Sequence, residues 1–293
     1  MNISSHRVLV TGCNGYIGSH TVKALKKVGF EVHGIDWNRN TGNDVSRYVD
    51  DLMIGNAFNL TKAYRYDAVI HLAGSISVEE SVKEPYLYYH NNVDTTHWQL
   101  HFNGVNGCDN FIFASTAAAF NPVSPYAQSK LMAESLVKNM ARNYTIFRFF
   151  NVAGSDGEFG QIGNATHLIR IAAETAAGKR PSMKLYGTDW DTSDGTCVRD
   201  YVHVQDLVDS IVKAVYNPLN TEYECLGRGY GVSCREVIKI MKEVSGIDFE
   251  VIETDRRPGD VARLVVDQPS RLLECKRDLY DMCRSAYELE LKR

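Results

Sequence analysis

Tyr126 and Lys130 are the two residues of this chain whose types and spacing are best suited to chemistry. Ser124 is a suitable helix N-cap and Pro125 a suitable first helical residue, so Tyr126 is predicted to open a helix. Lys130 then lies one turn further along, on the same face as the phenol. A phenol ionises near pH 10, and a nearby ammonium lowers that pKa because it favours the phenolate.

A hydroxyl at the end of the preceding predicted strand completes the arrangement. Thr116 follows an apolar run at 111–115 and could hold a substrate hydroxyl beside the phenol. A hydroxyl, a phenol and a lysine so placed suit removal of a proton from an alcohol while hydride leaves its carbon. The alternative is that Tyr126 and Lys130 are ordinary residues of an amphipathic helix, although no other tyrosine here has a lysine four positions later.

The N-terminal segment has the pattern of a dinucleotide-binding turn. An apolar run at 7–10 is followed by Thr-Gly-Cys-Asn-Gly-Tyr-Ile-Gly at 11–18 and then by a helix-compatible run. Gly12, Gly15 and Gly18 permit a tight turn and the close approach of a pyrophosphate to a helix N-terminus. Strand, glycine turn and helix follow one another in the order that this mechanism requires.

An acidic residue after the next predicted strand indicates which dinucleotide is bound. The run at 31–35 ends in Asp36, eighteen residues past Gly18. A carboxylate there can accept the adenosine ribose hydroxyls and would repel a 2′-phosphate. The pattern therefore predicts NAD rather than NADP, a preference that the nearby Arg39 weakens.

Strand-like and helix-like segments alternate through the first half of the chain. The expected elements after the first two strands are a strand at 67–73, a long helix at 80–101, a strand at 110–115 and a helix at 126–142. Such alternation predicts an α/β fold, a doubly wound parallel sheet of the NAD-binding Rossmann type, with ligands at the carboxyl ends of the strands. We expect this domain to span residues 1–150.

The second half is richer in loops and is expected to form a smaller α/β domain at 151–293, partly interleaved with the first. Arg199 and Arg257, predicted to lie in loops, could clamp a diphosphate through bidentate hydrogen bonds. Each alone is more often a surface ion-pair residue, but together they suggest a nucleotide-diphosphate substrate. Two short helices are expected at the C-terminus.

Composition excludes several classes of protein. The net charge is −4 with no basic run, which argues against nucleic acid or an anionic membrane as a partner. The seven cysteines are scattered without a CxxC pair, so we expect free thiols and no metal site. No signal-peptide profile or membrane-spanning run is found, and a cytoplasmic protein is expected.

Over nearly its whole length the chain resembles the extended short-chain dehydrogenase/reductases. The segments that carry this resemblance are Val10-Thr-Gly-Cys-Asn-Gly-Tyr-Ile-Gly-Ser-His, Val69-Ile-His-Leu-Ala-Gly, Glu80-Ser-Val, Tyr126 with Lys130, and Arg148-Phe-Phe-Asn. Two further segments resemble the UDP-glucose 4-epimerase family more specifically, Asp194-Gly-Thr-Cys-Val-Arg-Asp-Tyr-Val-His-Val and Arg256-Arg-Pro-Gly-Asp. The resemblance implies a tightly held NAD that is not consumed and a UDP-hexose substrate.

The resemblance also implies roles for individual residues. Tyr126 would be the base, Lys130 would bind the nicotinamide ribose and tune the phenol, and Thr116 would hold the sugar O4. The residues implied at the cofactor are Gly12, Gly15, Tyr16, Ile17, Gly18, Asp36, Trp37, Asn38, Asn40, Asn56, Ala57, His71, Leu72, Ala73, Gly74, Ser75, Asn91, Ser115, Tyr126, Lys130 and Phe150. Those implied at the substrate are Thr116, Tyr126, Phe149, Asn151, His167, Leu168, Lys184, Leu185, Tyr186, Arg199, Tyr201, Arg257, Asp260 and Leu264.

The chain departs from this family at several positions. Asn56 stands where an aspartate usually binds the adenine-side ribose, and Ile76 stands where some relatives have a lysine near the pyrophosphate. Most relatives carry a markedly longer loop between the positions of Phe120 and Ser124. Leu264 matches the position at which a tyrosine excludes N-acetylated sugars.

Three other functions remain open. A nucleotide-sugar dehydratase needs an acid and a base directly after the threonine, where this chain has three alanines at 117–119. An epimerase of UDP-N-acetylhexosamines or UDP-uronates would use the same residues. A catalytically weak NAD or nucleotide-sugar binding protein would explain the shortened loop. Relatives pair the helices around 80–101 and 126–142 with those of a second subunit, so a homodimer is expected.

Overall fold

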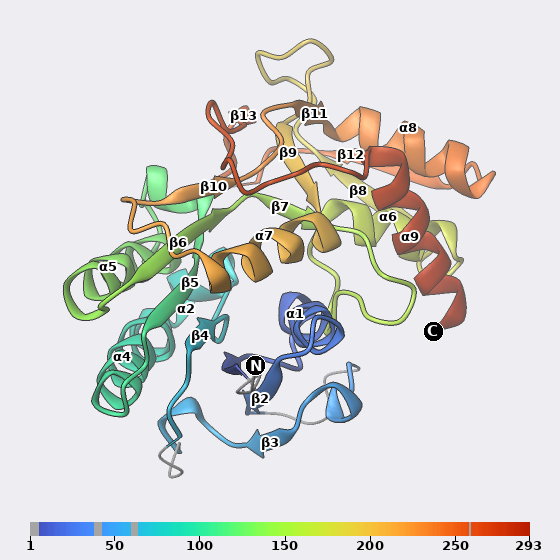
Figure 1. Ribbon diagram of the computed structural model, residues 1–293. Coiled ribbons are helices and arrows are strands. Elements are labelled where there is room, and N and C mark those ends of the chain that lie inside the picture. The colour runs from blue at the N-terminus through green and yellow to red at the C-terminus, as the bar shows by residue number, and fades with distance from the viewer. Residues whose placement is uncertain (1–5, 38–42, 60–63, 258) are drawn as a thin grey trace. The chain divides into compact units, whose positions relative to one another are not determined.

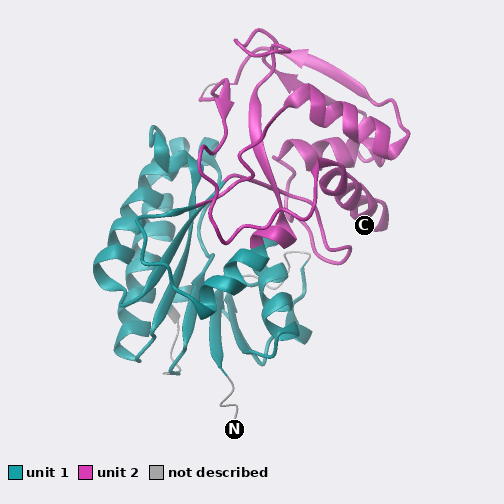
Figure 2. Ribbon diagram, turned by 45° about the horizontal axis from the view of Figure 1, so that its top comes forward, with its two compact units in different colours: residues 1–149, 208–224 teal, residues 150–207, 225–293 magenta. Residues whose placement is uncertain are grey.

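The computed structural model describes residues 6–37, 43–59, 64–257 and 259–293, for residue 59 the backbone only. The chain packs as two compact units (Figure 2). Unit 1 comprises Met1–Phe149 and Val208–Glu224, and unit 2 comprises Phe150–Leu207 and Cys225–Arg293. That these units are the NAD-binding and nucleotide-sugar-binding domains stays a prediction.

A seven-stranded sheet is the centre of the first half of the chain (Figure 1). Its order is β10-β6-β5-β4-β1-β2-β3, and each pair from β6 to β3 is parallel. The strands are β1 (Arg7–Thr11), β2 (Glu31–Asp36), β3 (Asp51–Ile54), β4 (Ala68–His71), β5 (Asn110–Thr116), β6 (Tyr144–Phe149) and β10 (Glu224–Leu226). The predicted fold class, a doubly wound parallel sheet, is confirmed.

Helices cover both faces of this sheet. They are α1 (Tyr16–Lys27), α2 (Val78–Lys83), α3 (Pro85–Tyr89), the π-helix η3 (His90–Asp94), α4 (Thr95–Val105), α5 (Pro125–Met140) and α7 (Val204–Tyr216), with 3-10 turns η1 (Ser46–Tyr48), η2 (Ala57–Asn59) and η4 (Ala117–Phe120). Leu100 of α4 and Val137 of α5 pack with strand residues such as Phe113 in one buried cluster. Burial of this apolar face against the sheet is what stabilises the helices.

The prediction of one continuous helix at 80–101 is wrong. The structure divides this region into the four helical segments α2, α3, η3 and α4. Pro85 has no N–H and restricts the residue before it. Glu84 accordingly leaves the helical region, with φ −128° and ψ 60°, between α2 and α3. A π-helical turn over His90–Asp94 then shifts the register before α4 begins.

The start of α5 agrees with the sequence prediction. Ser124 is the N-cap, and its Oγ accepts a hydrogen bond from the Ala127 N–H at 3.2 Å. Pro125 is the first helical residue, one position before Tyr126. The helix ends at Met140, two residues before the expected end.

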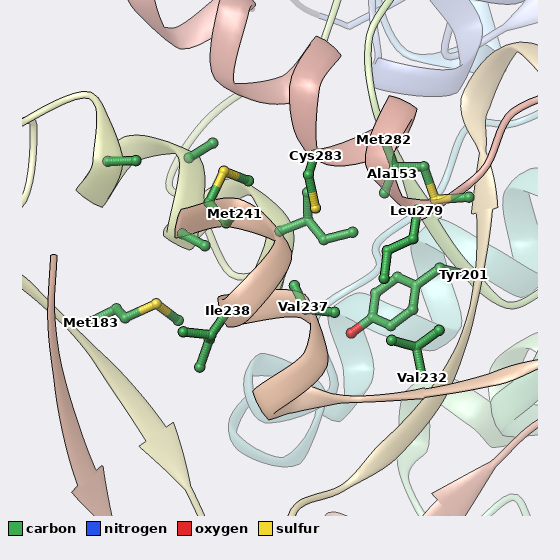
Figure 3. Close-up of a cluster of buried hydrophobic side chains, with 14 of the residues drawn as sticks. Ala153, Met183, Tyr201, Val232, Val237, Ile238, Met241, Leu279, Met282 and Cys283 are labelled. Carbon is green, nitrogen blue, oxygen red and sulfur yellow. The ribbon is translucent and has the colours of Figure 1, made fainter. Parts of the chain in front are cut away.

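Unit 2 contains shorter sheets and three helices of its own. One sheet has the order β11-β9-β13, with β7 also paired to β9, and a second pairs β12 with β8. These elements are β7 (Asn151–Ala153), β8 (Ser182–Tyr186), β9 (Val198–His203), β11 (Gly231–Ser233), β12 (Glu250–Thr254), β13 (Arg263–Leu264), α6 (Leu168–Ala176), α8 (Cys234–Ser245) and α9 (Leu279–Lys292). Figure 3 shows part of the core, where Tyr201, Val237 and Cys283 are buried together.

Two expectations for unit 2 are corrected. Arg199 lies within β9 and not in a loop, because Val198 and Arg199 continue the ladder with β11 and β13. Only one helix, α9, is found in the described part of the chain after β13. It begins with a capping box in which Asp278 and Asp281 accept each other's backbone N–H groups, a strong helix-start signal. All seven cysteines are free thiols, as expected.

Candidate active site

The glycine turn lies between β1 and α1 and is closely packed. The Gly12 N–H donates to Ile35 O at 2.8 Å, and Gly12 has a φ of +70°, which favours glycine. A Cβ at Gly12 would lie 2.9 Å from the Ala73 nitrogen, and a Cβ at Gly18 would lie 2.0 Å from the Gly12 oxygen. Helix α1 has Gly15 as its N-cap and no side-chain cap, an arrangement that suits a phosphate at its N-terminus.

Asp36 ends β2 beside this turn. Its carboxylate is buried, and Oδ2 accepts a hydrogen bond from the Asn14 N–H at 2.9 Å. The turn therefore fixes the carboxylate at the edge where a ribose is expected. Trp37 is 79% exposed. Asn38 and Asn40, both predicted at the cofactor, lie outside the described residues.

The carboxyl end of β4 is joined to β1 through His71. The His71 Nδ1 lies 2.7 Å from Thr11 Oγ1, and its Nε2 lies 3.0 Å from Thr96 Oγ1. Complete burial, aided by the charge of Lys130, lowers the pKa of His71 to about 3, so the ring is neutral. His71 orients the strand end that leads to Gly74 and does not supply a charge.

Asn91 and Asn92 hold the loop after β4. Asn91 Nδ2 donates to Ser75 Oγ at 2.9 Å, as suits a residue predicted at the cofactor edge. Asn92, which the sequence analysis missed, is more buried: its amide accepts from the Ser75 N–H at 2.8 Å and donates to Ser129 Oγ at 2.9 Å. The signal was the repeated Asn-Asn pair, but only the π-helical turn directs the second amide inward.

The adenine-side residues are less enclosed. Asn56 is exposed, and its Oδ1 accepts a hydrogen bond from the Phe58 N–H at 3.2 Å. Ala57 is buried, and its carbonyl accepts from Gln99 Nε2 at 2.7 Å. The pair thus presents one polar side chain and one fixed backbone to this edge.

Tyr126 and Thr116 meet as the sequence predicts. The Thr116 hydroxyl is near enough to the Tyr126 phenol to lower its pKa, and the Tyr126 ring contacts Tyr88 edge-on at 6.3 Å. Thr116 Oγ1 also accepts the Ala118 N–H at 3.2 Å, so it caps η4. The hydroxyl and the phenol therefore lie side by side at the carboxyl end of β5.

The direction of the Tyr126 pKa differs from the expectation. Burial raises the pKa of the phenol, and the nearby Thr116 hydroxyl only partly offsets this. Lys130 does not lower it, because its ammonium donates to Ala114 O at 2.8 Å and lies 4.9 Å from the centre of the Phe113 ring. An additional positive charge or hydrogen bond to the phenolate is needed for Tyr126 to act as a base at neutral pH.

Lys130 is itself perturbed. The side chain is 4% exposed, and burial lowers the pKa of its ammonium to about 8, while the charge of Glu134 opposes this. A Cβ at Gly74 would lie 3.4 Å from Lys130 Nζ, so the lysine reaches the loop after β4. The strands β4 and β5 and the helix α5 thus converge on this ammonium.

Four predicted substrate residues of unit 2 line one pocket: Asn151, His167, Leu168 and Tyr201. Burial raises the pKa of the Tyr201 phenol, and the neighbouring Asn151 side chain partly offsets this. Desolvation of the imidazole, aided by the charges of Arg170 and Arg257, lowers the pKa of His167, although the residue as a whole is exposed. The pocket offers uncharged hydrogen-bonding groups and the charged Arg170 and Glu290 beside apolar side chains.

The two predicted diphosphate arginines share one carboxylate. Arg257 Nε donates to Asp260 Oδ2 at 3.0 Å, and Arg199 Nη2 lies 3.6 Å from Asp260 Oδ1. The Arg257 guanidinium lies 4.8 Å from the centre of the Tyr186 ring. Leu264 pairs with Arg199 in the register of β13 and β9 and is half-buried. Five predicted substrate residues are therefore neighbours within unit 2.

Several other predicted residues occupy positions that limit their roles. Leu185 is buried in the unit 2 core, so only its backbone is available to a ligand, whereas Lys184 beside it is exposed. Ser115 donates to Glu134 at 2.5 Å and is oriented towards α5. Phe149 ends β6 and Phe150 is buried at the start of unit 2.

The sequence pattern of the NAD dependent epimerase/dehydratase family matches residues 8–225. The chain belongs to this family. It is 40% identical over 292 residues to a UDP-glucose 4-epimerase of Azospirillum brasilense, a match that covers 89% of this chain and 84% of that protein. The resemblance stated from the motifs is thereby confirmed.

Solved structures of epimerases have the same fold. The UDP-glucose 4-epimerase from Bifidobacterium longum, in complex with NAD+ and UDP, matches with a TM-score of 0.89 at 28% identity and covers 98% of both chains. The UDP-Glc/GlcNAc 4-epimerase from Campylobacter jejuni matches with a TM-score of 0.78 at 33% identity, over 99% of this chain and 100% of that one. Within the NAD dependent epimerase/dehydratase family, the likeness is thus to 4-epimerases.

The residues of unit 1 fit NAD, the cofactor in the name of the family. The close contacts at Gly12 and Gly18 leave no room for a Cβ, and Asp36 is held beside them. Among the described residues, no group of three or more His, Cys, Asp or Glu side chains could hold a metal ion. No helix within the same residues is long and apolar enough to span a membrane.

We expect Gly18→Ala to lower NAD affinity by at least about tenfold, because its Cβ would lie 2.0 Å from the Gly12 oxygen and force the turn apart. Calorimetric titration with NAD measures this. The matched control is Gly104→Ala, a helical glycine with no atom within 4 Å of the added Cβ. That control should keep NAD affinity and be stabilised by about 0.5–1 kcal/mol. Unchanged affinity in Gly18→Ala would contradict the assignment of the turn.

Proposed function

We propose that this chain is a UDP-glucose 4-epimerase that interconverts UDP-glucose and UDP-galactose through a 4-keto sugar, with an NAD that is not consumed. The observation that carries the proposal is the grouping of the half-buried Thr116 and Tyr126 with the buried Lys130, in an NAD-dependent family member whose relatives are named UDP-glucose 4-epimerases. A coupled assay on UDP-galactose tests it directly.

Each residue of the catalytic group has one task. Tyr126 removes the proton from the sugar O4 and later returns it, while Thr116 holds that oxygen beside the phenol. When bound, NAD would supply the hydride chemistry at C4 of the sugar. Lys130 would bind the nicotinamide ribose, and its ammonium would favour the phenolate only once it leaves the Ala114 carbonyl. The protein thus contributes positioning and electrostatics.

Unit 2 supplies the anchor that the mechanism needs. The keto sugar must turn over between the two hydride transfers, so binding energy has to come from the nucleotide and not from the hexose. Arg199 and Arg257 offer guanidinium groups to the diphosphate, and Asp260 keeps both in place until it binds. Asn151 and His167 offer hydrogen bonds to the rest of the nucleotide.

Dehydratase chemistry is the weaker alternative. Elimination needs an acid and a base after Thr116, and the turn η4 there begins with three alanines, of which Ala117 and Ala119 are buried. A catalytically weak binding protein remains an alternative that turnover measurements separate from the epimerase.

Tyr126→Phe is expected to retain folding and NAD binding but to lower kcat by roughly 10²-fold or more, because the variant loses its acid–base group. The measurement is the coupled assay together with NAD titration. Tyr230→Phe, a change at an exposed tyrosine of unit 2, is the matched control and should keep full turnover. Activity near that of the wild type in Tyr126→Phe would remove the phenol from the mechanism.

The preferred sugar depends on Leu264. We expect UDP-glucose and UDP-galactose to be the better pair and the N-acetylated pair to react more slowly, since a leucine leaves more room than a tyrosine but not an open pocket. The difference should be graded, about 10–200-fold in kcat/KM. The Campylobacter jejuni relative, by its name, acts on both kinds of sugar.

Leu264→Tyr should abolish N-acetyl activity and spare the plain hexoses, because the larger ring fills the space near the C2 substituent. Activity on both pairs is measured side by side for the wild type and the variant. Ile252→Tyr, at an exposed position of β12, is the control. If Leu264→Tyr keeps the wild-type ratio of the two activities, Leu264 does not face the sugar.

We propose that the protein is cytoplasmic and forms a homodimer through α2, α3, η3, α4 and α5. Val82, Tyr86, Met132 and Met140 expose apolar surface on these helices. Light scattering at micromolar concentration should give twice the mass of the chain, and Met132→Glu should shift the protein towards a monomer because it places a charge in the contact. A monomeric wild type would contradict this assembly.

A further inference from the structure

A buried carboxylate lies one helical turn beyond Lys130. Glu134 is 1% exposed, and its Oε1 accepts hydrogen bonds from Ser115 Oγ at 2.5 Å and Arg148 Nε at 2.9 Å. Its Oε2 accepts from Arg148 Nη2 at 2.8 Å, so the ion pair is bidentate. No step of the proposed reaction uses this pair.

The arginine of the pair is enclosed by two aromatic rings. The Arg148 guanidinium carbon lies 3.8 Å from the centre of the Tyr223 ring and 4.6 Å from that of Phe120. The two rings meet edge-on at 5.5 Å. The ion pair thereby joins α5 to β6. It also contacts Ser115 at the end of β5 and Phe120, the last residue of the turn η4 that follows Thr116.

Stability alone does not explain a buried ion pair at this place. Replacing such a pair by apolar side chains of similar volume is often neutral or stabilising, because desolvation of both ions offsets their attraction. The carboxylate has a second effect, however. Burial lowers the pKa of Lys130 to about 8, and the negative charge of Glu134 acts against that lowering. Without it, the lysine would lose its proton closer to neutral pH.

We propose that Glu134 is a positioning residue of the active site, whose negative charge lies one helical turn from Lys130 and whose bonds to Ser115 and Arg148 fix the end of β5 against α5. The proposal rests on the epimerase function, which gives the Lys130 charge its task. Arg148 has the complementary role, since its two hydrogen bonds hold the carboxylate in place.

The decisive variant replaces both members of the pair. Glu134→Gln alone leaves the Arg148 cation buried without its anion, which can prevent folding. The double variant Glu134→Gln/Arg148→Met removes both charges and should fold. Because the anion next to Lys130 is lost, the alkaline limb of its kcat/KM–pH profile should move to lower pH by about one unit. Activity at pH 8.5 should therefore fall several-fold more than activity at pH 7.

Glu222→Gln is the matched control. It makes the same carboxylate-to-amide change at an exposed residue. Glu222 forms an ion pair with Lys138, which lies on α5 as Glu134 does, and the two charged atoms are 3.7 Å apart. Exposed pairs contribute little, so both the pH profile and the thermal midpoint should stay at their wild-type values.

A second readout does not depend on activity. The pKa of Lys130 is lower in the folded than in the unfolded chain, so the unfolded chain binds more protons between the two values. Stability from this group therefore rises with pH above the folded value. In the double variant, the rise of the thermal midpoint should begin at lower pH than in the wild type and in Glu222→Gln.

These measurements separate failure of the proposal from failure of the proposed function. An inactive wild type would reject the epimerase, while the pH dependence of the thermal midpoint would still test the effect of Glu134 on Lys130. A double variant whose alkaline limb and thermal-midpoint onset both match the wild type would overturn the proposal and leave Glu134 as a packing residue.

Discussion

Parallel pairing of β4, β1 and β2 is the constraint on which the site in unit 1 depends. Thr11 pairs with Ile35 on one side and with His71 on the other. This register brings the glycine turn, Asp36 and Gly74 to one edge of the sheet, although they are far apart in sequence. A shift of one residue in either pairing would turn the side chains to the opposite face and disperse them.

Burial determines the direction in which the pKa of each polar group at this edge is shifted. His71 is held neutral, the pKa of the Tyr126 phenol is raised and that of the Lys130 ammonium is lowered. His71 and Lys130 have hydrogen-bond partners, as buried polar groups require. The low polarity also strengthens each interaction with a charge that enters the site, so a single positive charge near Tyr126 has a larger effect on its pKa there than in water.

Features that depend on local chemistry were predictable from the sequence. The glycine turn needs Gly12 and Gly18 because backbone atoms fill the space of a Cβ, and the cap at Ser124 follows from a hydroxyl placed before a proline. Features that depend on distant packing were not. The inward direction of Leu185 and the strand position of Arg199 are set by pairing with β12 and β11, which no short pattern reveals.

Pro85 lies within the helix predicted at 80–101, and its missing N–H is a break that the sequence itself shows. The sign of the Tyr126 pKa shift could not be read from spacing at all. A lysine one turn away stabilises a phenolate only if its ammonium is free to approach, and here the Ala114 carbonyl holds it. Sequence reasoning thus predicted which candidate groups lie near one another and not their electrostatic state.

The discontinuity of unit 1 has a consequence for how the protein is made. The ribosome releases residues 1–149 long before 208–224, yet the later segment completes the earlier one: Asn110 Nδ2 donates to Ala214 O, and Thr145 Oγ1 accepts the Leu219 N–H. Tyr223, which covers the Arg148 guanidinium, arrives with it. Until residues 208–224 are made, residues 1–149 lack these hydrogen-bond partners and their sheet is incomplete. Unit 1 is therefore completed only after residues 150–207 of unit 2 have been synthesised. Translation therefore follows the order of the sequence, whereas unit 1 completes its fold only after a later part of the chain has been made.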